Sequence, residues 1–140
     1  MNKTVKLGNG PEIKRIGYGT MQLPGKGVWG ESEDPAGAVE VLRKAVELGI
    51  DFFDTADSYG PFVAEDLLRE ALHPYDGITV ATKAGLIRTG PGQWHQIGRP
   101  EYLRFALEMS LRRLGVEQID LFQLHRIDSQ VPAEEQIGVL

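Results

Sequence analysis

Four side chains in this sequence combine in a way that could move a proton. Asp54 ends a short apolar run and Tyr59 lies in the polar stretch that follows it. Lys83 and His125 each end a later apolar run. A carboxylate, a phenol, an ammonium and an imidazole together suit the delivery of a proton to a carbonyl oxygen while hydride reaches the carbonyl carbon.

Each residue type has a reason to be there. A phenol has a pKa of ~10 and is a poor acid at neutral pH, but an adjacent ammonium favours the phenolate. Lys83 can supply that charge, and Asp54 can hold Lys83 charged and in place through a salt bridge. His125 can hydrogen-bond the carbonyl oxygen and orient the substrate. None of these side chains donates hydride, so a cofactor must.

Taken singly, each of the four residues has a simpler structural explanation. An Asp after a strand is often a turn former or a helix cap, and a Tyr in a loop is usually a packed surface aromatic. A Lys at a strand end is commonly solvated, and a single His is more often a hydrogen-bonded structural residue than a catalytic one. The functional interpretation therefore depends on all four lying on one rim of the fold.

The predicted strands and helices place these four residues on one rim of the fold. Apolar runs predict strands over residues 16–21, 50–53, 78–82 and 119–124. Apolar residues at helical spacing predict helices over 35–48, 64–72, 100–114 and 133–140. Strands that alternate with helices indicate a parallel sheet with right-handed crossovers, whose carboxyl ends meet at one edge.

Local signals support these boundaries. Asp34 and Pro35 are an N-cap and a first helical residue, and Gly49 and Gly115 are natural helix stops. A turn at residues 8–11 predicts an N-terminal hairpin of 4–7 with 13–15. Gly-rich loops are expected over 22–33, around Trp29, and over 84–98, around Trp94 and His95.

Two architectures fit this order, a doubly wound open sheet and a (β/α)8 barrel. A doubly wound nucleotide-binding domain usually has its glycines in a tight turn that leads directly into a helix. Here a long loop separates Gly19 from the first helix, and no G-x-G-x-x-G motif opens it. The barrel is favoured because its sites are built from strand ends and βα loops.

Composition narrows the functional classes. The chain has 140 residues, a net charge of −5 and no basic run, which argues against nucleic acid or an anionic membrane surface as a partner. It has no Cys, no apolar run long enough for a membrane span and no signal-peptide pattern, so a cytoplasmic protein is expected. No metal is expected either, because no H-x-H or H-x-x-x-H spacing occurs and Lys83 would repel a cation.

A barrel needs eight strands and ~250 residues, whereas this chain supplies four βα units. We therefore interpret residues 1–140 as a single, incomplete domain, the N-terminal half of a barrel in a longer protein. The alternative is a half-barrel that completes itself by dimerising. A half-barrel would leave its first and fourth strands as unpaired edges, which invite self-association.

Several short segments of the sequence carry a family resemblance. They are Gly19-Thr20-Met21, Asp54-Thr55-Ala56-x-x-Tyr59-Gly60 with Glu65 beyond, Thr82-Lys83, and Leu121-Phe122-Gln123-Leu124-His125. With these segments the sequence resembles the aldo-keto reductases. The run His125-Arg126-Ile127-Asp128 and the small Gly-rich loops resemble the bacterial branch of the family, including its pyridoxal-reductase-like and uncharacterised oxidoreductases. The resemblance runs along the whole chain, in order, over the first half of the family's length.

The resemblance implies that Tyr59 is the general acid–base, that Lys83 and Asp54 tune it, and that His125 orients a small-molecule carbonyl substrate. It implies NADP(H) as the cofactor, without metal. Gly19, Thr20 and Met21, together with Asp54, are the residues it places near the nicotinamide.

The residues predicted to bind the substrate are Tyr59, His125 and Trp29. Among the loop residues, Trp29 is favoured over Trp94 and His95. The predicted function is NADPH-dependent reduction of aldehydes or ketones to alcohols. The rival is a non-catalytic role, as an assembly module or as a partner-binding regulatory subunit of the kind this family also contains. A lyase or isomerase on a barrel is a weaker third hypothesis, because such sites usually gather several carboxylates, a metal or a phosphate-binding group.

Overall fold

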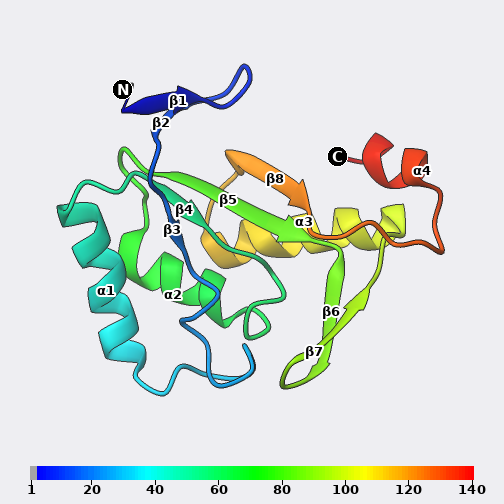
Figure 1. The fold of residues 1–140 in the computed structure, drawn as a ribbon, viewed down its shortest axis with the longest axis horizontal. Helices are drawn as coiled ribbons and strands as arrows, with labels where there is room; N and C mark the ends of the chain where they lie inside the picture. The colour runs from blue at the N-terminus through cyan, green and yellow to red at the C-terminus, as the bar shows by residue number, and fades with distance from the viewer. Residues whose placement is uncertain (1–2) are drawn as a thin grey trace.

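Four parallel strands form the central sheet of the molecule (Figure 1). In sheet order they are β3 (Tyr18–Gly19), β4 (Phe52–Asp54), β5 (Thr79–Ala84) and β8 (Leu121–Leu124). The structure is a computed structural model that describes residues 3–140. The predicted parallel sheet is confirmed, and β3, β4 and β8 are shorter than their apolar runs, whereas β5 extends two residues beyond its run. Ile50, for example, still donates its backbone N–H to the Ala45 carbonyl of the preceding helix and so lies outside β4.

The register of the strands brings the predicted site residues to one edge of the sheet. Gly19 pairs with Asp54, and Asp54 pairs in turn with Ala81. Lys83 pairs with Gln123, two residues before His125. Because all four strands run in the same direction, their carboxyl ends form a single rim.

Three helices lie side by side along the sheet (Figure 1): α1 (Pro35–Glu47), α2 (Val63–Leu72) and α3 (Pro100–Leu114). They bury their apolar faces against the strands. Leu42 of α1, Leu68 of α2 and Phe53 of β4 are fully buried in one cluster. Burial of large side chains like these is worth roughly 1.5–3 kcal/mol each.

The helix boundaries follow the predicted capping signals. The Asp34 carboxylate accepts a hydrogen bond of 2.9 Å from the backbone N–H of Gly37, and Pro35 is the first residue of α1. Gly115 ends α3 in a left-handed conformation with φ +73°, which glycine adopts at little cost. The N-cap and the glycine stop were both predicted correctly.

Two antiparallel hairpins accompany the sheet. The predicted N-terminal hairpin is confirmed as β1 (Thr4–Lys6) with β2 (Glu12–Lys14). The segment 84–98, predicted as a Gly-rich loop, is instead a second hairpin of β6 (Leu86–Gly90) and β7 (Gln93–Gln96). It projects from the end of β5 (Figure 1). The loop prediction was wrong because the turn at Pro91-Gly92 joins two pairing strands.

The sheet ends in two open edges, β3 and β8. After β8 the chain continues to a short helix, α4 (Ala133–Gly138), which contacts α3. Within residues 3–140, no helix is long and apolar enough to cross a membrane.

Candidate active site

An ion pair at the carboxyl ends of β4 and β5 forms the centre of the site. The Lys83 ammonium donates to the Asp54 carboxylate at 2.6 Å and to the Thr55 carbonyl at 2.9 Å. The Lys83 side chain is only 14% exposed, so the carboxylate compensates for the lost hydration of its charge. Adjacent parallel strands hold both residues, and strand pairing therefore fixes the ion pair.

Tyr59 completes this cluster. Its hydroxyl lies 3.4 Å from the Lys83 ammonium nitrogen, and its ring is buried. The loop between β4 and α2 carries Tyr59, and that loop is bound to β5 along its length. Thr55 donates to the Ala81 carbonyl at 2.8 Å, and Asp57 donates to the Lys83 carbonyl at 3.1 Å. These bonds turn the loop over the end of β5 and bring the phenol to the ammonium.

His125, directly after β8, lies across from Tyr59. The two ring centroids are 5.7 Å apart in an edge-to-face arrangement, and His125 Nδ1 is 3.3 Å from the Ser58 hydroxyl. Burial lowers the pKa of His125 to about 4, with further contributions from the Lys83 and Arg126 charges. The ring is therefore neutral at pH 7. If Nδ1 accepts from Ser58, then Nε2 carries the proton and can donate it in a hydrogen bond.

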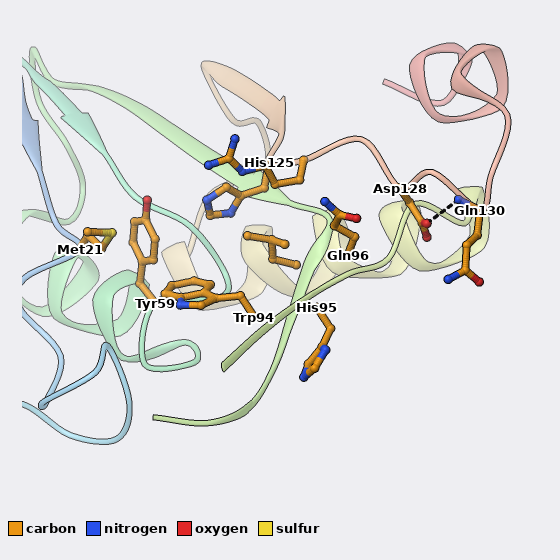
Figure 2. A pocket seen from close by; sticks show the side chains of 10 residues that line it. Met21, Tyr59, Trp94, His95, Gln96, His125, Asp128 and Gln130 are labelled. Atoms are coloured by element: carbon orange, nitrogen blue, oxygen red, sulfur yellow. Dashed lines mark hydrogen bonds between the residues drawn. The ribbon is translucent and has the colours of Figure 1, made fainter. Parts of the chain in front are cut away.

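A cavity of about 690 Å³ opens beside this cluster. In Figure 2, Tyr59, Trp94 and His125 gather at one end of it, and Asp128 and Gln130 lie at the other. The full set of lining residues is Met21, Tyr59, Leu86, Trp94, His95, Gln96, His125, Arg126, Asp128 and Gln130. The volume is in the range typical of small-molecule sites.

Besides Asp54, the residues predicted near a nicotinamide cofactor are Gly19, Thr20 and Met21, and they differ in exposure. Thr20 is fully buried, and both its backbone N–H and its hydroxyl donate to the Asp54 carbonyl, at 3.0 and 3.2 Å. Gly19 faces open space, since a Cβ added there would meet no atom within 4 Å. Met21 is 40% exposed and lines the cavity. Gly19 and Met21 thus leave accessible surface next to the Asp54–Lys83 pair.

The two tryptophans occupy different places from those expected. Trp94, on the hairpin of β6 and β7, lines the cavity with its ring centroid 6.4 Å from those of both Tyr59 and His125. Trp29, the favoured prediction, is not among the lining residues; its ring lies 5.8 Å from the Arg88 guanidinium. His95, the other loop residue considered for the pocket, lines the cavity and hydrogen-bonds Thr89 at 2.8 Å.

One buried carboxylate close to the site was not singled out from the sequence. Asp57 is 2% exposed, and its Oδ1 has no hydrogen-bond partner among the described residues. Burial, aided by the nearby Glu65 charge, raises the pKa of Asp57 to about 7. Its place within the Asp54–Tyr59 segment was the only sequence signal.

A buried polar network supports the site from behind. Glu65 of α2 is fully buried and accepts from the Thr82 hydroxyl at 2.6 Å and from Arg113 at 2.6 Å. Thr82 immediately precedes Lys83, so the network fixes the end of β5. A charged residue on the apolar face of α2, beside Ala64 and Leu68, was a usable signal that a buried partner exists.

Comparison with known proteins identifies the class to which this site belongs. Residues 15–140 match the aldo/keto reductase family. The chain therefore belongs to that family, and the resemblance seen in the sequence is confirmed.

Individual relatives support this assignment. The chain is 54% identical over 135 residues to an uncharacterised oxidoreductase of Schizosaccharomyces pombe, covering 96% of this chain and 44% of that protein. It is 40% identical over 139 residues to pyridoxine 4-dehydrogenase of Escherichia coli, covering 97% of this chain and 48% of that protein. The chain thus spans about half the length of the curated relatives it matches.

Solved structures agree on the fold. A glycerol dehydrogenase from Gluconobacter oxydans superposes with a TM-score of 0.83 at 33% identity, over 98% of this chain and 43% of that one. The holo form of an aldo-keto reductase from Bacillus halodurans superposes with a TM-score of 0.81 at 32% identity, over 98% of this chain and 44% of that one. The prediction that the chain forms the first four βα units of a (β/α)8 barrel is confirmed.

Proposed function

We propose that this chain carries the proton-transfer half of an NADP(H)-dependent oxidoreductase that reduces aldehydes or ketones to alcohols. The observation that carries the proposal is the position of the Lys83 ammonium, which contacts both the Asp54 carboxylate and the Tyr59 hydroxyl. Family membership supports oxidoreductase chemistry in general.

Tyr59 acts as the general acid. As the carbonyl oxygen gains charge, the phenol passes its proton to that oxygen and becomes a phenolate. The Lys83 ammonium, 3.4 Å away, stabilises the phenolate. Asp54 keeps the ammonium directed at Tyr59, because the ion pair at 2.6 Å restrains the lysine side chain.

His125 positions the carbonyl group. Its ring lies edge-to-face with Tyr59, on the same side of the cavity, and a neutral imidazole can donate one hydrogen bond to the carbonyl oxygen. Two donors that converge on one oxygen orient the carbonyl and polarise it. A neutral ring also avoids placing a second cation beside Lys83.

The residues present fit the nicotinamide end of the cofactor. Gly19 and Met21 offer accessible surface at the carboxyl ends of the strands, next to Asp54. NADPH, when bound, supplies hydride to the carbonyl carbon and is oxidised to NADP⁺. Thr20, whose hydrogen bonds are made to Asp54, contributes by fixing the backbone at this point.

The intact cluster favours an enzyme over a regulatory subunit. A scaffold or partner-binding module has no need of a buried ammonium in contact with both a carboxylate and a phenol, which is costly to desolvate. A small-molecule carbonyl substrate suits the adjacent cavity of about 690 Å³.

The active unit must also complete the barrel. The open edges β3 and β8 expose unpaired strand groups, which favour pairing with further strands. These strands come either from additional residues of a longer protein or from a second copy of this chain. Self-association of the 140-residue chain through β3 and β8 is therefore part of the proposal.

The test is a fluorescence titration of the protein with NADPH, with its mass in solution measured in parallel. NADPH consumption is then followed with a panel of carbonyls. The panel includes pyridoxal and the reverse reaction with glycerol and NADP⁺, because relatives carry the names pyridoxine 4-dehydrogenase and glycerol dehydrogenase. We expect NADPH to bind only to a species with a completed barrel, and that species to reduce at least one aldehyde. A completed barrel that binds NADPH and reduces no carbonyl would favour the regulatory alternative.

A further inference from the structure

We propose that Arg88 is a positioning residue that holds the general acid Tyr59 and the pocket wall Trp94 in one fixed arrangement. The inference rests on the proposed function, because it concerns the geometry of the same site. Arg88 lies on β6 and is not one of the residues that line the cavity.

The guanidinium of Arg88 directs every one of its N–H groups at a backbone carbonyl. Nε donates to Gln93 at 2.8 Å, and Nη2 donates to Gly27 at 2.8 Å and Gly90 at 3.4 Å. Nη1 donates to Ser58 at 2.9 Å and to Val28. An arginine has five such donors, so the side chain has no free donor for a ligand.

These carbonyls come from three separate segments that surround the site. Gly27 and Val28 belong to the loop between β3 and α1, and Ser58 belongs to the loop between β4 and α2. Gly90, the last residue of β6, and Gln93, the first residue of β7, flank the hairpin turn. The Ser58 carbonyl is part of the peptide bond to Tyr59, so this contact acts directly on the backbone of the general acid.

The flat face of the same guanidinium packs on Trp94, with 3.6 Å between the guanidinium carbon and the indole centroid. Trp94 in turn meets the rings of Tyr59 and His125 at 6.4 Å each. Stacking of this kind contributes a modest attraction that grows as the cation is withdrawn from water. Arg88 therefore ties the aromatic wall of the cavity to the loop that carries the acid.

The backbone conformation of Val28 supports the positioning role of Arg88. Val28 has φ +55°, which is rare and strained for a β-branched residue. Its carbonyl accepts from both Arg88 and the Gly60 N–H, directly after Tyr59. Among the described residues, no carboxylate lies within salt-bridge distance of Arg88. Withdrawing the Arg88 guanidinium from water without a carboxylate partner costs free energy. We infer that the role of Arg88 is to fix the geometry of the three segments it bonds.

Arginine is needed because the fork of donors is planar and fixed, whereas a lysine ammonium has three donors and cannot span the same carbonyls. Arg88→Lys keeps the charge and most of the bulk, so it tests the geometry rather than the electrostatics. Arg43 is a matched control, since it also donates to backbone carbonyls, those of Ala71 and Glu70, but does so between α1 and α2. Arg43→Lys preserves the same charge at a place remote from the cavity.

The experiment compares Arg88→Lys, Arg88→Met and Arg43→Lys in the purified, NADPH-binding protein, for a small aliphatic aldehyde and a bulky aromatic one. We expect Arg88→Lys to lower kcat/KM by about tenfold or more, with a larger rise in KM for the aromatic substrate and NADPH affinity unchanged. We expect Arg43→Lys to change kcat/KM by less than about twofold. Unchanged kcat/KM for both substrates in both Arg88 variants would overturn the inference.

A second readout does not depend on activity. The sequence has two tryptophans, so Trp29→Phe leaves Trp94 as the single indole emitter. In that background, Arg88→Lys should increase acrylamide quenching of Trp94 at least about twofold, because the indole loses its stacked partner. Unchanged quenching would overturn the inference even if turnover fell. If the protein reduced no carbonyl at all, the proposed function would fail, and the quenching measurement would still decide whether Arg88 holds Trp94.

Discussion

Two buried tyrosines lie at opposite ends of the same sheet and have opposite surroundings. Tyr59 is 6% exposed and Tyr75 is 8% exposed. At the carboxyl end, the Tyr59 hydroxyl meets the ammonium of Lys83. At the amino end, the Tyr75 hydroxyl donates to the Leu114 carbonyl at 2.9 Å, and burial raises the pKa of Tyr75. Under the proposed function, the Lys83 charge stabilises the phenolate formed when Tyr59 gives up its proton, whereas burial keeps the Tyr75 phenol protonated.

The aspartates show the same division. Asp54, at the carboxyl end, pairs with a lysine side chain. At the amino end, Asp51 accepts from the Lys14 backbone N–H at 3.0 Å and Asp120 accepts from the Val80 backbone N–H at 2.8 Å. Identical side chains thus pair with a buried lysine at one end of the strands and with backbone N–H groups at the other. In barrels, position along the strand separates functional residues from stabilising ones.

The largest expected effect is therefore on turnover at the carboxyl end. Tyr59→Phe in the NADPH-binding protein should lower kcat by about 10²–10⁴-fold, because it removes the proton donor, with NADPH affinity almost unchanged. Tyr75→Phe is the matched control. It should leave kcat unchanged and lower the free energy of unfolding by about 1 kcal/mol, since it loses one buried hydrogen bond. Steady-state kinetics and urea unfolding of the two variants test this. Wild-type-like turnover in Tyr59→Phe would remove Tyr59 from its role.

The two lysines extend the comparison. Lys83→Met should lower kcat by about 10²-fold or more, because the phenolate loses its stabilising charge. Lys14, at the amino end, donates to the Gly49 carbonyl, and Lys14→Met should leave kcat within about twofold of the unaltered protein. The measurement is the pH profile of kcat for both variants. If Lys83→Met only moved the pH optimum, the ammonium would not be essential.

The sequence alone predicted the carboxyl-end cluster because parallel strands constrain where their ends lie, whatever the loops do. Once residues 50–53, 78–82 and 119–124 are identified as parallel strands, Asp54, Lys83 and His125 must share a rim. Helix caps such as Asp34 and Gly115 could also be predicted from the sequence, since capping depends on only a few neighbouring residues.

The pocket wall could not be predicted in this way. Which aromatic residue faces Tyr59 depends on how long loops fold against each other, and the sequence favoured Trp29 whereas Trp94 lines the cavity. The hairpin of β6 and β7 was hidden by its glycines. The residues Leu86 to Gly90 and Gln93 to Gln96 pair across the Pro91-Gly92 turn, a signal that the glycine-rich composition obscured. Arg88 gave no signal at all, because all its hydrogen-bond partners are backbone carbonyls.

A smaller effect is expected when a carboxylate at the amino end is removed. Asp120→Ala leaves the Val80 N–H without its acceptor and should lower the free energy of unfolding by about 1 kcal/mol, with kcat unchanged. Asp76 is a suitable control, since it is exposed and also lies at the amino end of the sheet, on the connection between α2 and β5. Asp76→Ala should change stability by less than about 0.5 kcal/mol. A loss of turnover in Asp120→Ala, with stability intact, would contradict the division between the two ends of the sheet.

The smallest effect concerns the charge state of His125. Its pKa of about 4 lies below the ordinary value of 6.5, so the unfolded chain binds more protons than the folded one between these pH values. This contribution to stability is complete above about pH 6.5 and is lost as the pH falls through about 4. An NMR titration should show that the His125 ring is neutral near pH 7, with the imidazole signals assigned by their loss in His125→Gln. Arg126→Gln should raise the pKa, because it removes one of the nearby cations. A titration near the ordinary value would mean that His125 can be charged beside Lys83, and its assigned role as a neutral donor would be lost.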